Sequence, residues 1–303
     1  MTYTRRLPHF EFFSPHTPED VCAFLASHSD DTRLLAGGTE LILQMRRRET
    51  VPGFIIGLKG VPGLNDIREQ PNGGLAIGAM TAIHTLLTSA PIRANYGILA
   101  QTAAQMGSPE IRQLATLGGN LAAALPCADF PPVLMTLGAR IKLQSKQRQR
   151  MIPVEDFFIE FGKTAAARDE LLTEIQLPPV PPLSGGVYLK FHDRHSMDMT
   201  TVGVGAHVTC DEERRIFQDV KLALASSAPI PLRTYKAEKA LRGRPFSEDA
   251  LEEAASLVCE EAEPRSSWRA TKAFRMELLR TLTKRALRGA WEKAVSRSNG
   301  GRS

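Results

Sequence analysis

At the start of the chain, short apolar runs alternate with segments that carry apolar residues at helical spacing. Three runs are bounded by turn residues and are predicted as buried strands: residues 10–13, 33–36 and 54–58. A first helix is predicted from Thr17, since a hydroxyl residue, a proline and two acids in succession are typical of a helix start. A second helix is predicted over residues 40–48, after a pair of glycines. This order predicts a compact βαβαβ-like unit.

The middle of the chain has shorter periodic segments separated by turn-rich sequence. The strands predicted here are residues 75–78, 140–144 and 171–177, and the helices are residues 96–106, 130–138 and one that Thr81 caps. Residues 106–129 lie between two of these helices and are predicted as a loop. Four prolines and two glycines over residues 178–186 predict a linker that no regular element enters.

Beyond this linker the pattern changes to strands followed by helices. Three antiparallel strands are predicted over residues 187–191, 201–210 and 216–224, and three helices over 234–241, 247–261 and 268–295. The polar end of the chain is predicted to be disordered. We therefore predict four segments: a first subdomain over residues 1–57, a second over 58–177, a C-terminal α+β domain over 178–295 and a tail over 296–303.

Composition and charge narrow the function classes only slightly. The chain has 303 residues, of which 43% are hydrophobic and 23% charged, as in an ordinary globular protein of two or three domains. Its net charge of +5 comes from residues 46–48 and from the basic segment 265–302, but no aromatic residues interleave with these cations. A nucleic-acid-binding protein is therefore not favoured.

The cysteines and the N-terminus bear on metal binding and location. The four cysteines are far apart and form no C-x-x-C pair, which speaks against a zinc site or a cysteine-bound iron–sulfur cluster and for a reducing compartment. The N-terminus lacks the apolar core of a signal peptide, and the chain has no run of about 18 apolar residues. We expect a soluble, cytoplasmic protein without a membrane span.

Two distant loops with paired glycines carry the strongest chemical signal. The second, residues 116–120, lies within the predicted loop 106–129 and contains Gly118 and Gly119 between Thr116 and Asn120; the first, residues 34–41, contains Gly37 and Gly38. Glycines let a backbone approach a ligand closely, and free N–H groups can hold an anion such as pyrophosphate. One Gly-Gly pair more often marks an ordinary turn. Two such loops predict one ligand that is held from two sides.

The common catalytic and nucleotide-binding motifs are absent from the sequence. It contains no G-x-G-x-x-G, no P-loop, no G-x-S-x-G and no H-E-x-x-H, and its histidines lack metal-ligand spacing. We predict no metal site and no nucleophile–base pair in this chain. The charged segment 190–198 is either an exposed hairpin or a loop that faces the first two subdomains.

These motifs together carry a resemblance to a known family. AGGTEL at residues 36–41, GSPEIRQLATLGGN at 107–120, the acid Asp129 before a proline-rich helix start, and KFHDRHSMDM at 190–199 resemble the FAD-binding subunit of the molybdenum hydroxylases. This family includes xanthine dehydrogenase and the aerobic, molybdenum-type carbon monoxide dehydrogenase. The resemblance implies an α+β protein in which two subdomains bind FAD in a fold of the vanillyl-alcohol-oxidase (PCMH) type. A smaller C-terminal α+β domain with a three-stranded antiparallel sheet follows them.

The resemblance also implies which residues contact FAD. The first pyrophosphate loop would be Leu34, Leu35, Ala36, Gly37, Gly38, Thr39, Glu40 and Leu41, and the second would be Thr116, Leu117, Gly118, Gly119 and Asn120. Met106 would pack near the cofactor, and Asp129 would accept hydrogen bonds from its adenosine end. Leu172 and Lys190 would approach it, while Arg194 and Asp198 fall in a segment that lies near the flavin ring in some relatives.

The implied function is electron transfer within a larger complex. In the family, a large subunit with the molybdenum cofactor oxidises the substrate, and a small subunit with 2Fe–2S clusters passes electrons to FAD and then to NAD or a quinone. We expect a hetero-oligomer, a dimer of heterotrimers. The cysteine-rich insertion that binds a 4Fe–4S cluster in one relative is missing here, so this chain is expected to hold no cluster itself.

Two other functions stay open at this point. The chain could be a free-standing FAD-dependent oxidase of the same fold, which would need an acid or base facing the flavin and a substrate pocket of its own. It could also be a non-catalytic nucleotide-binding module in an assembly.

Overall fold

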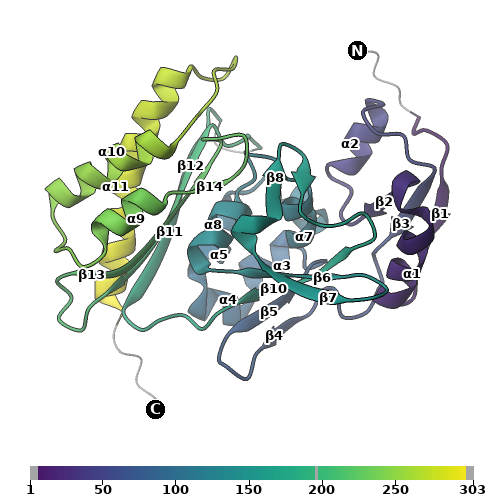
Figure 1. Cartoon of the computed structure of the whole chain (residues 1–303), viewed down its shortest axis with the longest axis horizontal. Coiled ribbons are helices and arrows are strands. Elements are labelled where there is room, and N and C mark those ends of the chain that lie inside the picture. The colour runs from purple at the N-terminus through teal and green to yellow at the C-terminus, as the bar shows by residue number, and fades with distance from the viewer. Residues whose placement is uncertain (1–5, 195–196, 298–303) are drawn as a thin grey trace.

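The computed structural model describes residues 6–194 and 197–297, which form three main sheets with helices packed between and around them (Figure 1). In Figure 1 the chain begins at the sheet on the right, continues through the central sheet and ends in the sheet and helices on the left. Residues 298–303 of the predicted tail and residues 195–196 of the charged segment lie outside the described residues. Within the described ranges, no helix is both long and apolar enough to cross a membrane.

The first sheet is the predicted βαβαβ-like unit. Its strands are β1 (Glu11–Phe13), β2 (Thr32–Leu35) and β3 (Phe54–Gly57), parallel and in the order β1-β3-β2. The helical elements between them are α1 (Pro18–His28), the 3₁₀ turn η1 (Ser29–Asp31) and α2 (Leu41–Arg46). Helix α1 begins at a capping box, because Thr17 Oγ1 accepts from the Asp20 amide while the Asp20 carboxylate accepts from the Thr17 amide.

The second sheet has the order β4-β5-β10-β6-β7 and is antiparallel. Its strands are β4 (Ile67–Glu69), β5 (Leu75–Gly78), β6 (Arg140–Gln144), β7 (Gln149–Pro153) and β10 (Leu171–Leu177). The edge strands β4 and β7 were not predicted. Nor was the small β8–β9 pair (Phe158–Glu160 and Lys163–Thr164), which follows the 3₁₀ turn η2 (Val154–Phe157). These short segments lack the apolar runs that revealed the central strands.

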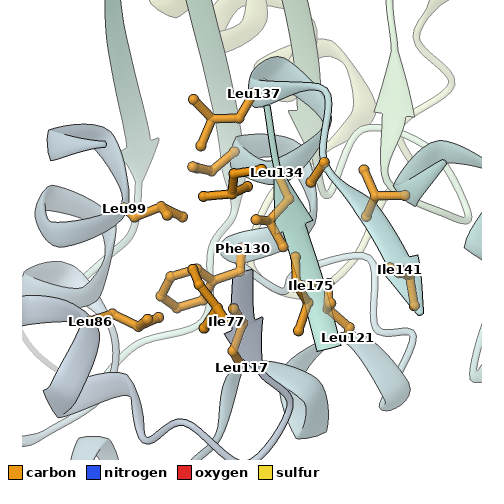
Figure 2. Close-up of a cluster of buried hydrophobic side chains, with 14 of the residues drawn as sticks. Ile77, Leu86, Leu99, Leu117, Leu121, Phe130, Leu134, Leu137, Ile141 and Ile175 are labelled. Atoms are coloured by element: carbon orange, nitrogen blue, oxygen red, sulfur yellow. The ribbon is translucent and has the colours of Figure 1, made fainter. Parts of the chain in front are cut away.

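Helices cover this sheet and form the largest core with it. They are α3 (Ile83–Thr88), α4 (Ala90–Asn95), α5 (Gly97–Gln105), α6 (Pro109–Leu114), α7 (Leu117–Ala122) and α8 (Phe130–Leu137). Phe130 and Leu134 of α8 lie among Ile77 of β5, Ile175 of β10 and residues of α5 (Figure 2). Every residue of α8 is buried, because this helix also packs against the third sheet.

Two predictions about this part of the chain are wrong. Residues 106–129 are not a continuous loop but contain α6 and α7, whose first turns are capped by the hydroxyls of Ser108 and Thr116. Thr81 does not cap α3, since Ala82 takes the N-cap position without a side-chain bond. Thr81 instead stays extended, and its carbonyl accepts from the Leu117 amide at 3.0 Å. In both cases tertiary contacts override local preference.

The third sheet is antiparallel and has four strands rather than the predicted three. Its order is β11 (Ser184–Phe191), β12 (Val202–Cys210), β13 (Phe217–Ala225) and β14 (Leu232–Arg233), and the last of these is a two-residue edge strand. Helices α9 (Tyr235–Leu241), α10 (Glu248–Glu261) and α11 (Lys272–Ser296) cover one face, while α5 and α8 pack on the other (Figure 1). Helix α11 begins after its N-cap Thr271, four residues later than predicted, and Ser296, assigned to the tail, is its last residue.

The predicted linker 178–186 was placed too far along the chain, because β11 already begins at Ser184. Gly185 is inside this strand, where a β-carbon would lie 2.4 Å from the carbonyl oxygen of Ala290 in α11. The glycine therefore permits close packing of a helix on a strand instead of breaking the strand.

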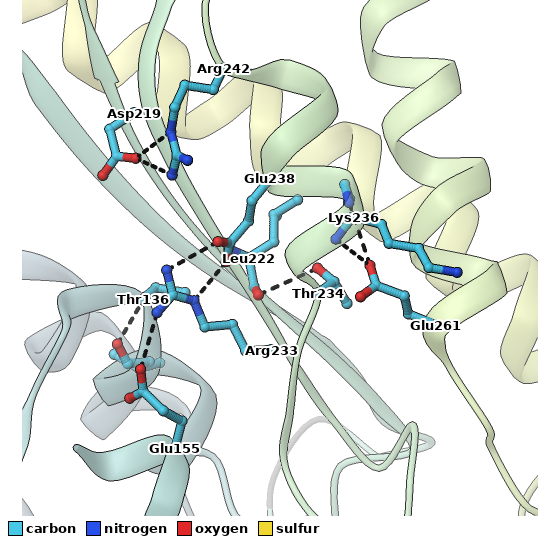
Figure 3. Close-up of polar contacts among 12 residues, drawn as sticks. Thr136, Glu155, Asp219, Leu222, Arg233, Thr234, Lys236, Glu238, Arg242 and Glu261 are labelled. Carbon is cyan, nitrogen blue, oxygen red and sulfur yellow. Dashed lines mark hydrogen bonds and ion pairs between the residues drawn. The ribbon is translucent and has the colours of Figure 1, made fainter. Parts of the chain in front are cut away.

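Arg233 connects the third sheet to the second subdomain. Its guanidinium Nε lies 2.8 Å from Glu238 in α9, and Nη1 lies 3.1 Å from Glu155 in η2 (Figure 3). Glu238 also accepts from the Leu222 amide of β13 at 2.9 Å, so one carboxylate holds both a strand and this arginine. These contacts fix the orientation of the third sheet against α8 and η2.

Candidate cofactor site

The fold brings the two glycine loops together, although about eighty residues separate them in the sequence. A β-carbon on Gly119 would lie 3.6 Å from the β-carbon of Ala36. A β-carbon on Gly37 would lie 1.9 Å from the carbonyl oxygen of Leu114, at the end of α6. The Gly37 position therefore requires glycine for close approach of the first loop to α6, whereas Gly119 and Ala36 are at an ordinary van der Waals distance.

The first glycine loop joins the end of β2 to the start of α2 and leaves backbone donors available. Gly38 has φ +72°, a conformation that favours glycine. Among the described residues, no acceptor lies within hydrogen-bond distance of the amides of residues 36–40. Unpaired buried amides are costly, so a run of them indicates a solvent- or ligand-facing loop. This run is the kind of donor set that holds an anion.

The second glycine loop differs, because its backbone amides are not free but already have acceptors within the chain. The Gly118 amide donates to the carbonyl of Ala79 at 2.8 Å, and the Gly119 amide donates to Thr116 Oγ1 at 3.0 Å. The neighbouring amides of Leu117 and Asn120 also have acceptors, Thr81 and Thr116. These amides tie α7 to the segment after β5, so the loop forms a fixed wall.

This wall nevertheless presents an unsatisfied polar atom. Asn120 Oδ1 is buried, and no donor among the described residues lies within reach of it. Leaving a buried carbonyl oxygen without a partner costs about 1–3 kcal/mol. Asn120 lies next to Gly119, which faces Ala36 of the first loop. The arrangement therefore fits a bound group that supplies donors to Asn120 and accepts from residues 36–40.

Asp129 and Lys190, two predicted site residues, are partners of one another. Lys190 Nζ lies 2.9 Å from Asp129 Oδ2, and the lysine side chain is only 2% exposed. Tyr188 donates to Asp129 Oδ1 at 2.8 Å and Thr200 donates to the same oxygen at 2.6 Å. Burial, followed by the Asp129 carboxylate, raises the pKa of Tyr188 well above its usual range, so the phenol stays a donor. The cluster joins α8 to β11.

The other predicted residues lie at different distances from this centre. Leu172 in β10 is buried. The carbonyl of the next residue, Thr173, accepts from the Ala79 amide at 2.9 Å, and the Ala79 carbonyl in turn accepts from the Gly118 amide. The carbonyl of Met106 accepts from Arg112 at 2.9 Å. The Met106 side chain packs against the largest core, which the second sheet forms with its helices.

The Arg194 side chain is exposed, whereas the Asp198 side chain is only 4% exposed. The Asp198 carboxylate accepts from the amides of Asp193 and Arg194 at 2.9 Å, and the Arg194 guanidinium approaches it at 3.4 Å. These contacts pair Asp198 within the segment itself, whereas Lys190 at the start of the segment is paired with Asp129 of the second subdomain.

Sequence reasoning missed Cys127, Tyr188 and Thr200. Burial raises the pKa of the Cys127 thiol, and the carboxylates of Asp129 and, more weakly, Glu40 add to this effect. The charges of the Asp129 cluster and of the first glycine loop both act on this thiol pKa. Tyr188 could have been found from strand periodicity, because it is two residues before Lys190 and points to the same side of β11. Thr200 carries no sequence signal.

Within the described part of the chain, no three His, Cys, Asp or Glu side chains are placed to hold a metal ion. The site therefore consists of amides, one amide side chain and hydroxyls, with a buried ion pair beside them.

Comparison with known proteins identifies the family of this chain. Residues 8–180 match the family model described as the FAD binding domain in molybdopterin dehydrogenase, and residues 187–290 match the CO dehydrogenase flavoprotein C-terminal domain. The chain belongs to the FAD-binding subunits of the molybdenum hydroxylases. As a member of this family it is an FAD-binding subunit of an oxidoreductase.

Individual relatives agree over almost the whole chain. The xanthine dehydrogenase FAD-binding subunit of Escherichia coli O157:H7 is 30% identical over 92% of this chain and 96% of its own length. The carbon monoxide dehydrogenase medium chain of Hydrogenophaga pseudoflava is 29% identical over 95% of this chain. A solved structure of that enzyme superimposes with a TM-score of 0.92, covering 95% of this chain and 99% of the other, and quinoline 2-oxidoreductase from Pseudomonas putida 86 superimposes with 0.88. The predicted family and α+β fold class are confirmed.

Proposed function

We propose that this FAD-binding subunit takes electrons from a 2Fe–2S cluster of a partner subunit and passes them through FAD to an acceptor such as NAD or a quinone. The observation that carries the proposal is that the unbonded amides at residues 36–40 and the unsatisfied Asn120 Oδ1 belong to two glycine loops that are in contact through Ala36 and Gly119. These groups suit a pyrophosphate with its neighbouring hydroxyls or amides, because the donors and the acceptor are already positioned. Bound FAD would supply the redox chemistry.

The protein's own residues would position the cofactor and exclude water. In this proposal the amides of residues 36–40 donate to the pyrophosphate, flanked by Leu34, Leu35 and Leu41, while Asn120 and Thr116 contribute side-chain groups. Gly118 and Leu117 form the wall behind them. Asp129 keeps lone pairs beyond its three donors for the adenosine end, and Lys190, Leu172 and Met106 line the surroundings.

The partners follow from the family. The relatives are named as medium chains or as subunits of dehydrogenase complexes, such as the 6-hydroxypseudooxynicotine dehydrogenase complex of Paenarthrobacter nicotinovorans. For this chain we propose a large subunit with the molybdenum cofactor, a small 2Fe–2S subunit, assembly as a dimer of heterotrimers and a cytoplasmic location. We also propose that residues 1–57 and 58–177 act as the two FAD-binding subdomains and 178–295 as the C-terminal domain.

Affinity purification of the tagged chain from its native host tests this function. We expect the flavin absorbance bands, two further chains and the spectrum of 2Fe–2S clusters, with the clusters reoxidised through FAD after the complex is reduced by its substrate. A yellow protein that comes alone and reacts directly with its own substrate would instead support a free-standing oxidase. A colourless protein that cannot be reconstituted with FAD would contradict both.

A further inference from the structure

A cavity of about 400 Å³ lies between the second subdomain and the C-terminal domain. Its walls come from the junction of α4 and α5, the start of β11, the middle of β12 and the end of α11. Figure 1 shows α5 beside β11, and these two elements are in contact. None of the residues proposed to bind FAD lines it. Its volume is in the range of small-molecule sites.

The charged residues of the cavity wall are all cations. Arg93, Lys293 and Arg297 line it, and no aspartate or glutamate does. Lys293 Nζ donates to the carbonyl of Gly186 at 3.1 Å and approaches Gln101 Oε1 at 3.4 Å, which leaves one of its three N–H donors. Across residues 6–194 and 197–297, no carboxylate forms an ion pair with any of these three cations. The cavity wall therefore has an excess of positive charge.

A buried histidine without a partner lies in the same wall. His207 of β12 is only 8% exposed, and neither ring nitrogen has a hydrogen-bond partner among the described residues. Burial, followed by the charge of Lys221, lowers its pKa to about 4, so the ring is neutral at pH 7. A neutral imidazole offers one hydrogen-bond donor and one acceptor. Here only a molecule in the cavity could pair with them.

Two backbone features shape the cavity wall. A β-carbon on Gly186 would lie 3.2 Å from both His207 and Ile98, so glycine at this position lets these two side chains pack closely against β11. Helix α5 begins at Gly97 without a side-chain cap, and no acceptor among the described residues lies near the amides of Gly97 and Ile98. Such a helix start attracts negative charge.

We propose that this cavity binds a small organic molecule with a phosphate group. The phosphate would lie between Arg93, Lys293, Arg297 and the start of α5, since three cations and a helix start suit a dianion better than a single carboxylate. The apolar side of the cavity, formed by Ile98, Leu137 and Val180, would cover the organic part, and His207 would bond a polar group on it. This ligand is distinct from FAD, and the inference does not depend on the proposed electron transfer.

Calorimetric titration of the FAD-loaded full chain with phenyl phosphate tests this site, because loaded FAD blocks the first glycine loop. We expect Arg297→Gln to weaken binding about tenfold or more, the ordinary effect of removing one charge-assisted contact. The matched control is Arg285→Gln, an exposed arginine on the same helix that does not line the cavity, and it should bind as the native chain does. Equal weakening by both variants would overturn the proposal, since it would indicate a general charge effect.

Two further probes separate the ligand classes. Inorganic phosphate should bind more weakly than phenyl phosphate if the apolar wall is used, and benzoate should bind more weakly than both if a dianion is preferred. Benzoate binding as tight as phenyl phosphate would overturn the phosphate assignment. The ring signals of His207 in a carbon-13 NMR spectrum, assigned with His207→Gln, should shift on addition of phenyl phosphate. Binding without any shift at His207 would place the ligand elsewhere and overturn the proposal.

Discussion

The two glycine loops look alike in sequence but differ in what their backbones do. In the second loop, the amides of residues 117–120 all have acceptors within the chain. In the first, the described residues provide no acceptor for the amides of residues 36–40. A Gly-Gly pair therefore indicates that another group comes close to the backbone. Whether that group is part of the protein or a ligand depends on the surrounding fold.

The physical reason for the difference lies in the neighbours of each loop. Gly118 packs against Ala79, where a β-carbon would come within 2.7 Å of the alanine carbonyl oxygen. The second loop thus extends the pairing after β5 and forms a fixed wall. The first loop continues from β2, whose partner β3 ends at Gly57, and it is free to bond a ligand. We therefore expect changes in the first loop to affect FAD more than the apoprotein.

The largest effect is expected for Gly37→Ala. The new methyl group would lie 1.9 Å from the carbonyl oxygen of Leu114, a backbone atom that cannot rotate away. The first loop must then move away from the end of α6, just before the second loop, and we expect loss of FAD retention together with destabilisation of about 3 kcal/mol. Flavin absorbance after gel filtration and urea unfolding measure the two effects.

Two glycines serve as controls for this variant. Gly97→Ala places its methyl group in open space and should leave FAD binding unchanged. Gly118→Ala should lower the stability of the apoprotein, because the clash with Ala79 disturbs the wall itself. Normal FAD affinity in Gly37→Ala would show that contact between the two loops is not needed for the cofactor.

Hydrogen exchange compares the amides directly. In the apoprotein, the amides of residues 36–40 should exchange rapidly and those of residues 117–120 slowly, because only the second set is bonded. With free FAD at about 100 times its Kd, only about one molecule in 100 lacks FAD, so exchange of amides in the first loop should slow by about 100-fold. The second loop should change little. Mass spectrometry of peptides from both loops gives the measurement, and FAD protection confined to the second loop would reverse the assignment.

Asn120→Leu separates stability from binding. Removing the unsatisfied Oδ1 should leave the thermal midpoint of the apoprotein unchanged or higher, because a buried carbonyl without a partner is destabilising. The same change should weaken FAD binding about tenfold, the loss of one hydrogen bond of about 1.4 kcal/mol. Asn65→Leu, at an exposed position, is the control. An apoprotein that loses stability in Asn120→Leu would show that the amide is structural.

The positions of the central strands and of the two glycine loops could be predicted from the sequence, but the different hydrogen bonding of the two loops could not. Apolar runs located the central strands, and the two Gly-Gly pairs located the loops. The sequence could not show that Thr116 caps α7 and so binds the Gly119 amide, because this bond depends on a helix that two glycines disfavour. It could not show the Asp129 cluster either, since Lys190 and Thr200 reach Asp129 from sequence distances of 61 and 71 residues.

The smallest expected effect concerns Cys127, whose thiol pKa is raised by burial, by Asp129 and, more weakly, by Glu40 of the first loop. Because burial and these carboxylates raise its pKa, the thiol should stay protonated at pH 8 and react slowly with iodoacetamide, with the rate rising only above pH 9. FAD should slow this reaction several-fold further by ordering the first loop. Cys259 on α10 is similarly half-buried and should be insensitive to FAD. Equal protection of both cysteines would mean that FAD tightens the whole chain, and the distinction between an open loop and a fixed wall would then fail.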